Sequence, residues 1–210
     1  MGGAPTSRFW DRTAARYARR PVGDEAAYET KLEKTRVHLR PHMEILEFGC
    51  GTGSTALRHA PYVKHIHAID ISAKMLEVAR GRAAAAQVKN VTFEQAAIDG
   101  FEAPERSFGA VLGLNVLHLL ADKDAAIAKV HRMLEPGGVF VSSTACIGDM
   151  TFLLRPFLAA GHFCGVFPPV DIFTTRQLTD SLTTAGFAID HLWQPGKGKA
   201  VFVVARKGAA

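Results

Sequence analysis

Three closely spaced glycines constrain the fold of this chain more than any other feature. Gly49, Gly51 and Gly53 stand between an apolar segment, residues 45–48, and a helix-forming segment, residues 54–59. Glycines at this spacing permit a tight turn from a strand into a helix, and backbone N–H groups can approach a bound ligand because no side chain blocks the way. The turn predicts a nucleotide-like ligand at the carboxyl end of a strand, although the spacing alone does not decide which nucleotide.

Strand-like and helix-like segments alternate through the middle of the chain. Strands are expected at 45–48, 65–70, 91–96, 109–116 and 139–143. Helices are expected between them, at 54–59, 73–86 and 122–133. Such alternation indicates right-handed βαβ units and a parallel sheet. The sequence therefore predicts an α/β fold, a doubly wound sheet with helices on both faces.

The segments that flank this alternation have patterns of their own. Residues 7–40 are expected to form two helical pieces separated by residues 21–24, with Asp24 as the cap of the second piece. After Ala145 the alternation stops, and a further helix is expected at 175–185. Two last strands follow, at 187–193 and 200–206. The turn-rich residues between these strands suit an antiparallel pair.

An acidic residue stands where the ribose of a nucleotide is commonly held. Asp70 ends the second expected strand, about 20 positions after the glycine turn, where a carboxylate can accept hydrogen bonds from both ribose hydroxyls. An aspartate at this place can also cap the following helix. Ser72 serves that second role better.

Several motifs resemble those of one family, the class I methyltransferases. Residues 47–53, Glu-Phe-Gly-Cys-Gly-Thr-Gly, resemble its first motif, whereas nicotinamide enzymes more often space their glycines as G-x-G-x-x-G. Further matches follow in order at 70–76, 107–118 and 133–138. The resemblance covers about residues 40–145 by motif and 174–206 by topology. It implies a seven-stranded, mainly parallel sheet with the last strand antiparallel, and S-adenosylmethionine as cofactor, with S-adenosylhomocysteine as its product.

The resemblance also implies positions for the parts of this cofactor. The residues expected near its methionine part are Glu47, Gly49, Cys50, Gly51, Thr52, Gly53, Asn115 and Val116, with Tyr17 toward the carboxylate. Asp70 is expected at the ribose, and Ile71 and Met75 around the adenine. Many family members place an acidic residue after the third strand for the adenine amino group, but this chain has Ala97 and Ile98 there. The adenine would then depend on backbone and apolar contacts, with Asp99 as a possible substitute.

The methyl acceptor is expected to be a small, apolar or aromatic molecule. In-line alignment with the methyl group is the main requirement, and a base is added when the nucleophile carries a proton. His118 is the first candidate base, and packing beside the cofactor is its alternative role. Weaker candidates are His162, Cys164, Tyr28 and Asp149. Residues 115–118 lack the Asn/Asp-Pro-Pro-aromatic motif of enzymes that methylate nucleic-acid bases, which makes nucleic acid an unlikely substrate.

The 210 residues are expected to form a single methyltransferase domain. Its expected parts are a helical lid at 1–40, a cofactor-binding core at 41–145, an apolar substrate-side insertion at 146–173, and a final helix and strand pair at 174–210. The net charge is +5, and arginines recur at near-helical spacing in the lid. These arginines suit either the solvated side of a lid helix or a face toward nucleic acid or a membrane surface.

Three scattered cysteines suggest a reducing cytoplasm, and no apolar run is long enough to span a bilayer. No metal site is expected, because His65 and His67 have no third ligand at a sensible spacing. The oligomeric state is not readable from the chain. Two other functions stay open at this point: a nicotinamide-dependent oxidoreductase, and a non-catalytic protein that binds S-adenosylmethionine.

Overall fold

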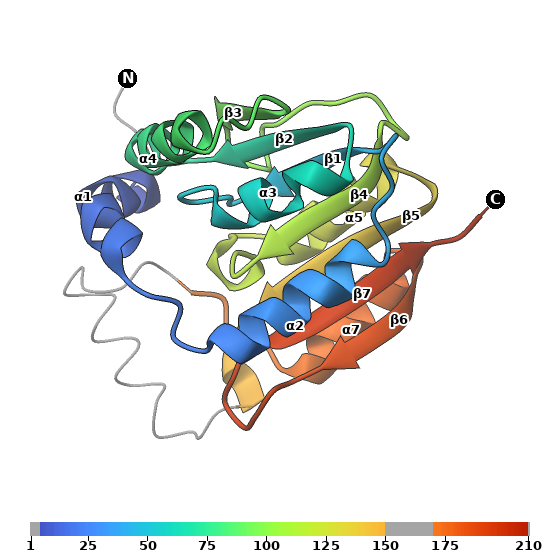
Figure 1. The fold of residues 1–210 in the computed structure, drawn as a ribbon. Helices are drawn as coiled ribbons and strands as arrows, with labels where there is room; N and C mark the ends of the chain where they lie inside the picture. Colours follow the sequence, from blue (N-terminus) through green and yellow to red (C-terminus); the bar gives the residue numbers. More distant parts are fainter. Residues whose placement is uncertain (1–4, 150–169, 210) are drawn as a thin grey trace.

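A seven-stranded β-sheet runs through the molecule, with helices on both of its faces (Figure 1). The structure is a computed structural model that describes residues 5–149 and 170–209. The strands are β1 (Glu44–Phe48), β2 (His65–Asp70), β3 (Val91–Gln95), β4 (Phe108–Leu114), β5 (Leu134–Thr144), β6 (Phe187–Trp193) and β7 (Val201–Lys207). Their order in the sheet is β3-β2-β1-β4-β5-β7-β6. All neighbours pair in parallel except β7, which is antiparallel to both β5 and β6. The predicted fold class is confirmed.

The α-helices are α1 (Pro5–Arg19), α2 (Glu25–Arg36), α3 (Ser54–His59), α4 (Ala73–Ala85), α5 (Lys123–Met133) and α7 (Thr175–Thr184). Four of the described α-helices, α2, α4, α5 and α7, begin at a polar side chain that accepts a hydrogen bond from the first turn. Asp24 caps α2 by accepting from the N–H of Ala27 at 3.0 Å, and Ser72 caps α4 by accepting from Met75 at 3.1 Å. These caps satisfy backbone donors that have no partner inside the helix. Both caps confirm the sequence prediction.

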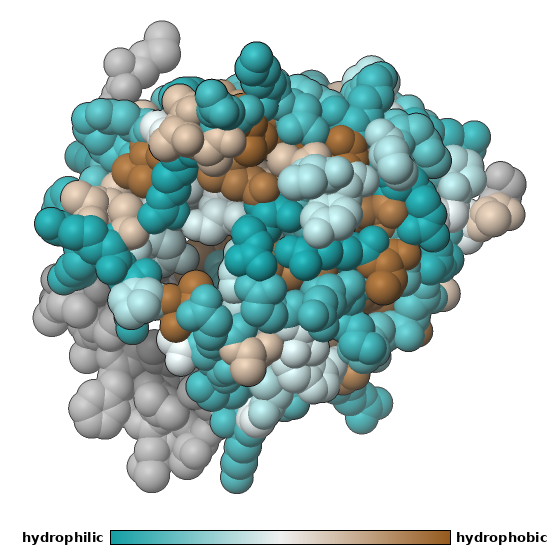
Figure 2. Space-filling view, viewed as in Figure 1, coloured by the Kyte–Doolittle hydropathy of each residue, from teal (hydrophilic) through white to brown (hydrophobic). Residues whose placement is uncertain are grey.

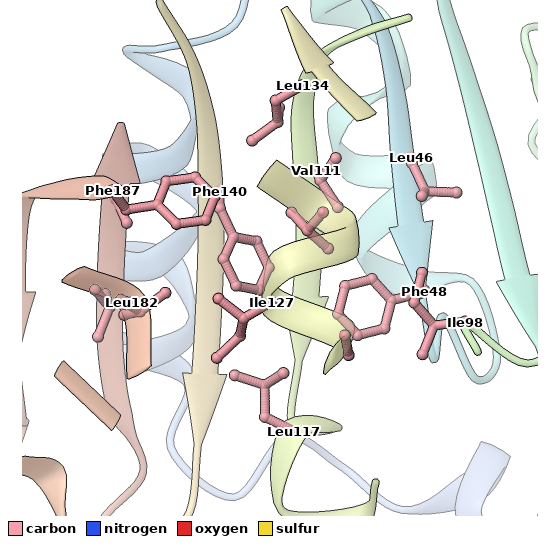
Figure 3. Close-up of a cluster of buried hydrophobic side chains, with 14 of the residues drawn as sticks. Leu46, Phe48, Ile98, Val111, Leu117, Ile127, Leu134, Phe140, Leu182 and Phe187 are labelled. Atoms are coloured by element: carbon pink, nitrogen blue, oxygen red, sulfur yellow. The ribbon is translucent and has the colours of Figure 1, made fainter. Parts of the chain in front are cut away.

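Side chains alternate between the two faces of the sheet, and each face carries its own apolar cluster. The cluster beneath α5 and α7 includes Leu46, Phe48, Val111, Ile127 and Phe140 (Figure 3). The cluster beneath α3 and α4 includes Ile45, Ile66, Leu76, Leu112 and Val141. Neighbours such as Ile45 and Leu46 belong to different clusters because successive side chains of a strand point to opposite faces. Strands buried on both sides explain why the sequence shows nearly continuous apolar runs.

Two strand boundaries differ by more than one residue from those expected. The Pro136-Gly137-Gly138 segment, expected to be a turn, lies inside β5, which starts directly after α5. The pairing with β4 shifts between Phe108 and Ala110, and this bulge accommodates the extra residues. β4 ends at Leu114, two residues early, because Asn115 has φ of +57° and cannot continue a strand. That turn of the backbone directs the chain after β4 across the end of the sheet.

The topology places one end of the sheet in position to bind a ligand. The strand order reverses between β1 and β4, and ligands of open α/β sheets bind at the carboxyl ends of strands on either side of such a switch point. The arrowheads of the parallel strands point toward the side where α1 lies (Figure 1). Helix α1 packs beside α4 at this edge. The switch point is thus covered by a helix from the start of the chain.

The face that carries α2 is mainly hydrophilic, with small apolar areas between polar groups (Figure 2). Within the described residues, no helix combines the length and the apolar character needed to cross a bilayer. Most of the expected substrate-side insertion, with His162 and Cys164, lies outside the described residues.

His59, at the end of α3, gives the fold a pH dependence that can be measured. Its side chain is fully buried, and neither ring nitrogen has a hydrogen-bond partner among the described residues. Burial, aided by the charges of Arg36 and Arg58, lowers the pKa of this imidazole to about 4. The ordinary pKa in an unfolded chain is about 6.5. The unfolded state therefore binds more protons between these two values, and folding is opposed as the pH falls.

We predict that the free energy of unfolding loses on the order of 3 kcal/mol from this group as the pH falls from 6.5 to 4. A His59→Leu variant should lack this component, because leucine does not titrate and suits the apolar surroundings. Urea unfolding at several pH values measures the difference between the two proteins. A His42→Leu variant, which changes an exposed residue, serves as the control. A constant difference between His59→Leu and wild type across this range would contradict the prediction.

Candidate functional site

A cavity of about 590 Å³ lies at the carboxyl ends of β1, β2 and β4. Its described walls come from six places in the chain: one face of α1, the glycine turn after β1, the ends of β2, β3 and β4 with the residues that follow each, and residues 170–171. Most of the described lining is apolar, and Asp70, Asp99 and Asp171 contribute carboxylates. A cavity of this size and composition is typical of a small-molecule or cofactor site.

The glycine turn forms one wall, and its backbone has a conformation that side chains disfavour. Gly49, Gly51 and Gly53 have φ values of +66°, +54° and +74°. A Cβ atom on Gly49 would lie 2.7 Å from Cγ2 of Val116, and one on Gly53 would lie 2.9 Å from Cβ of Ala79. At Gly51 a Cβ would meet nothing within 4 Å and would instead occupy the open space of the cavity. Gly49 and Gly53 therefore allow close packing against neighbouring side chains, and Gly51 leaves room for a ligand to approach the backbone.

Asp70 joins the glycine turn to the end of β2. One carboxylate oxygen accepts from the N–H of Gly51 at 2.8 Å, and the other accepts from the N–H of Ser72 at 2.8 Å. Burial raises the pKa of this carboxyl, while the same two hydrogen bonds act in the opposite direction. The side chain lines the cavity, so the orientation of its oxygens is fixed before any ligand arrives.

Helix α1 is held over the cavity by polar contacts with α4. The Ser72 hydroxyl donates to Asp11 at 2.7 Å, and the N–H of Lys74 donates to the same oxygen at 3.2 Å. Arg82 donates to the carbonyl of Ala18 at 2.7 Å. Trp10 and Tyr17 thereby line the cavity from above, with ring centroids 6.2 Å apart.

Glu47 is a buried carboxylate behind the glycine turn. It is the last residue but one of β1, and its Oε2 atom has no hydrogen-bond partner among the described residues. Burial, and secondarily the charge of Asp70, raises the pKa of this carboxyl to about 8. A buried carboxylate without a partner is costly unless a positive group approaches it. The side chain is not among the residues that line the cavity, and without a ligand its carboxyl is mainly protonated at pH 7.

The residues expected around adenine and ribose come together in the structure. Ile71, Met75, Ala97 and Ile98 all line the cavity, as does Asp99, which the sequence suggested as a substitute for the missing acidic residue. Ile98 and Met75 are buried, and both belong to the lining of the cavity. Asn115 and Val116 line the opposite wall, after β4.

Some predicted residues lie outside the cavity wall. Thr52 is buried and accepts a hydrogen bond from Arg82 at 2.8 Å. Cys50 is buried, and burial raises the pKa of its thiol well above the ordinary value. Gly53 caps α3 through its backbone. These residues, like Glu47, support the wall from behind instead of facing its interior.

His118 also lies outside the described lining of the cavity. Its Nδ1 atom is 3.0 Å from the hydroxyl of Thr144, and its carbonyl accepts from the N–H of Asp171 at 2.8 Å. Burial lowers the pKa of the imidazole, which is therefore neutral at pH 7. The neutral ring can accept a proton, and its backbone lies between Val116 and Leu119, which both line the cavity.

Sequence reasoning did not include several lining residues. Among these are Trp10, Phe48, Leu119, Leu120, Val170 and Asp171. Trp10 had a usable signal, because it lies seven positions before Tyr17 and so on the same helical face. Phe48 also had one, because it directly precedes Gly49 in the turn. The remaining four had none, because their approach to the cavity depends on how the chain folds back after β4.

Comparisons with known proteins agree with this arrangement. Residues 45–138 match the family model described as a methyltransferase domain. The malonyl-[acyl-carrier protein] O-methyltransferase of Paenibacillus sp. (strain JDR-2) is 32% identical over 161 residues, which cover 72% of this chain and 57% of that protein. The demethylmenaquinone methyltransferase of Symbiobacterium thermophilum is 32% identical over 145 residues, covering 67% and 57%. The chain thus spans less than two thirds of the length of these curated relatives.

Among solved structures, that of the [4+2]-cyclase SpnF superposes with a TM-score of 0.79 at 18% identity, covering 100% of this chain and 99% of that one. At this identity the likeness concerns the fold. The match over 45–138, the sheet order and the glycine turn at the switch point agree with one another. The chain therefore contains a methyltransferase domain with the class I, Rossmann-like fold of the S-adenosylmethionine-dependent methyltransferases.

Proposed function

We propose that the protein transfers a methyl group from S-adenosylmethionine to a small, apolar or aromatic acceptor. The observation that carries this proposal is the cavity at the switch point, in which Gly51 offers open backbone, Asp70 offers fixed oxygens, and the buried carboxyl of Glu47 behind the wall would be ionised more readily beside a positive group. These features suit a cationic nucleoside better than a dinucleotide, whose pyrophosphate is itself negative.

In the proposed complex each part of the cofactor has a matching surface. Asp70 holds the ribose hydroxyls, and the turn from Gly49 to Gly53 borders the methionine part, with Tyr17 and Asn115 near its end. Ile71, Met75, Ala97 and Ile98 enclose the adenine, and Asp99 is placed to accept from its amino group. Cys50, Thr52 and Val116 keep the wall in shape. When bound, S-adenosylmethionine supplies an activated methyl group on a positively charged sulfur.

The protein's own contribution is mainly to orient the acceptor and exclude water. Leu114, Val116, Leu119 and Leu120 give the described lining after β4 an apolar character, which supports an apolar or aromatic acceptor. The named relatives methylate a malonyl-carrier protein and demethylmenaquinone, according to their names. We propose a small-molecule acceptor here also, in preference to nucleic acid. We further propose that the 210 residues form a single domain and that the protein is cytoplasmic.

A first prediction concerns Asp70. An Asp70→Ala variant should bind S-adenosylhomocysteine at least about tenfold more weakly, because charge-assisted hydrogen bonds of this kind contribute 1.5–3 kcal/mol. Asp70→Asn keeps the shape of the side chain but can accept only one of the two backbone hydrogen bonds, so it shows how much of the loss comes from the removed charge and acceptor. Calorimetric titration measures binding, and thermal unfolding shows whether the turn is intact. Tight binding of NAD together with no binding of S-adenosylhomocysteine would overturn the proposed cofactor.

A second prediction concerns Glu47. Its pKa of about 8 in the folded protein lies above the ordinary value of 4.5, so the folded state binds more protons between these values. The free energy of unfolding without ligand should therefore fall as the pH rises from 4.5 to 8, by at most on the order of 5 kcal/mol from this group. Glu47→Gln should remove that component, seen as a changing difference from wild type in urea unfolding. The same difference at every pH would show that Glu47 is not buried as described.

A third prediction concerns His118 as the proposed general base. His118→Gln should slow methyl transfer by about a hundredfold for a protonated nucleophile, while binding of S-adenosylhomocysteine stays nearly unchanged. Thr144→Val is the matched variant, because it removes the hydroxyl that contacts both Nδ1 and the backbone N–H of His118 but keeps the imidazole, and it should slow transfer less than His118→Gln. Methyl transfer from labelled cofactor is the measurement. Equal rates for His118→Gln and wild type would remove His118 from the mechanism.

The fold alone does not decide the reaction, since a [4+2]-cyclase has nearly the same fold. A direct assay for transfer of labelled methyl groups to a panel of quinols, phenols and malonyl thioesters separates the possibilities. Binding of S-adenosylhomocysteine without transfer to any of these would favour a non-catalytic protein or another reaction.

A further inference from the structure

A second cavity, of about 240 Å³, adjoins the first, and Leu114 and Asn115 line both of them. It lies between α2, the ends of β4 and β5, and the connection from β6 to β7. The two cavities therefore meet at the point where the chain leaves β4. A molecule held in the second cavity would extend toward the end of the first cavity where the methionine part of the cofactor is proposed to lie.

The lysine of α2 that faces this second cavity is unusual in its surroundings. The ammonium of Lys31 donates to the hydroxyl of Ser143 at 2.8 Å, and Ser143 is almost completely buried. Within the described residues, no carboxylate lies within 4.0 Å of this ammonium, whereas the nearby Asp24 is 3.9 Å from Lys199. Burial lowers the pKa of Lys31, and the charge of Asp24 partly opposes this shift. An ammonium has three donors, so two remain for a ligand.

The other polar groups of the second cavity include Asp24 and Lys199, whose carboxylate and ammonium are 3.9 Å apart, and several hydroxyls. The phenol of Tyr28 is 3.4 Å from the hydroxyl of Thr55, and both residues line the cavity. Burial raises the pKa of Tyr28, with a smaller contribution from Glu47, so the phenol stays protonated and can donate. The N–H of Asn115 donates to the carbonyl of Ser143, which ties the junction of the two cavities to the residue beside Lys31.

We propose that the second cavity binds an anionic oxygen of the methyl acceptor, such as a carboxylate, and that Lys31 determines specificity for it. This inference rests on the proposed function and adds the chemical class of the acceptor. A half-buried ammonium with only one neutral partner gains a charge-assisted hydrogen bond when a carboxylate enters. Tyr28 and Ser143 supply hydroxyls around the same oxygens, and the apolar residues beyond Asn115 take the remainder of the acceptor.

The arrangement also explains why an acceptor would be oriented. Its acid group would be fixed at α2, and its other end would pass Leu114 and Asn115 into the first cavity. Fixing one end of a small molecule reduces the number of orientations of the other end, which is the main requirement for in-line transfer. Lys31 is thus a positioning residue, and it does not touch the reacting methyl group.

The test compares acids with their uncharged amides. Benzoate and benzamide, and separately hexanoate and hexanamide, are titrated by NMR into protein saturated with S-adenosylhomocysteine. For at least one pair, wild type should bind the acid about tenfold more tightly than the amide. Lys31→Met should abolish this preference, and Lys31→Arg should restore part of it. Lys34→Met, a change at an exposed residue of the same helix, should leave the preference unchanged.

The outcomes separate this inference from the proposed function. Equal binding of acid and amide in both pairs, or a preference that survives in Lys31→Met, would overturn the role of Lys31, even when S-adenosylhomocysteine binds normally. Absence of S-adenosylhomocysteine binding to wild type would instead overturn the proposed function. Lys31→Met is also checked for unchanged S-adenosylhomocysteine affinity, so that misfolding is not mistaken for a lost acid site.

Discussion

The carboxylate of Asp70 is the interaction on which the rest of the site depends. By accepting from Gly51 and Ser72 it joins the turn after β1 to the end of β2. Ser72 then caps α4 and donates to Asp11, which holds α1 over the cavity. One buried acid thus connects two strands, a helix N-terminus and the covering helix. Each contact is short, and its partner groups would otherwise lack acceptors in a buried place.

The same arrangement concentrates negative charge in an apolar region. Glu47 and Asp70 both lie within or behind the cavity wall, and burial raises the pKa of each. Keeping these two carboxyl groups buried near each other costs free energy of folding at neutral pH when no ligand is bound. A positive group that binds beside them reduces this cost. Binding energy and stability are therefore linked at this position, because a cation relieves an electrostatic cost that the empty fold carries.

The two cavities are formed mostly by different segments of the chain, and each is proposed to bind a different molecule. The first is built on the βαβ core, whose turn and carboxylates are set by local sequence. The second is built where α2 meets β5 and the last strand pair, and two ammonium groups, Lys31 and Lys199, line it with one carboxylate, Asp24, which lies 3.9 Å from Lys199. The proposed acceptor site therefore has more cationic groups than the proposed cofactor site. The junction at Asn115, with its positive φ, lies between them.

The sequence by itself determined where strands and helices alternate, where several helices start, and where the turn needs glycine. Caps such as Asp24 and Ser72, and the glycines at 49–53, act through their immediate neighbours, so their effects are visible in a short segment. Asp99 and the departure at Ala97 were readable for the same reason. Only the tertiary structure decided that Trp10 covers the cavity, that Glu47 lacks a partner, and that Lys31 meets Ser143 across more than a hundred positions. Those contacts join distant segments, and their geometry follows from sheet order and helix packing, which no local pattern specifies.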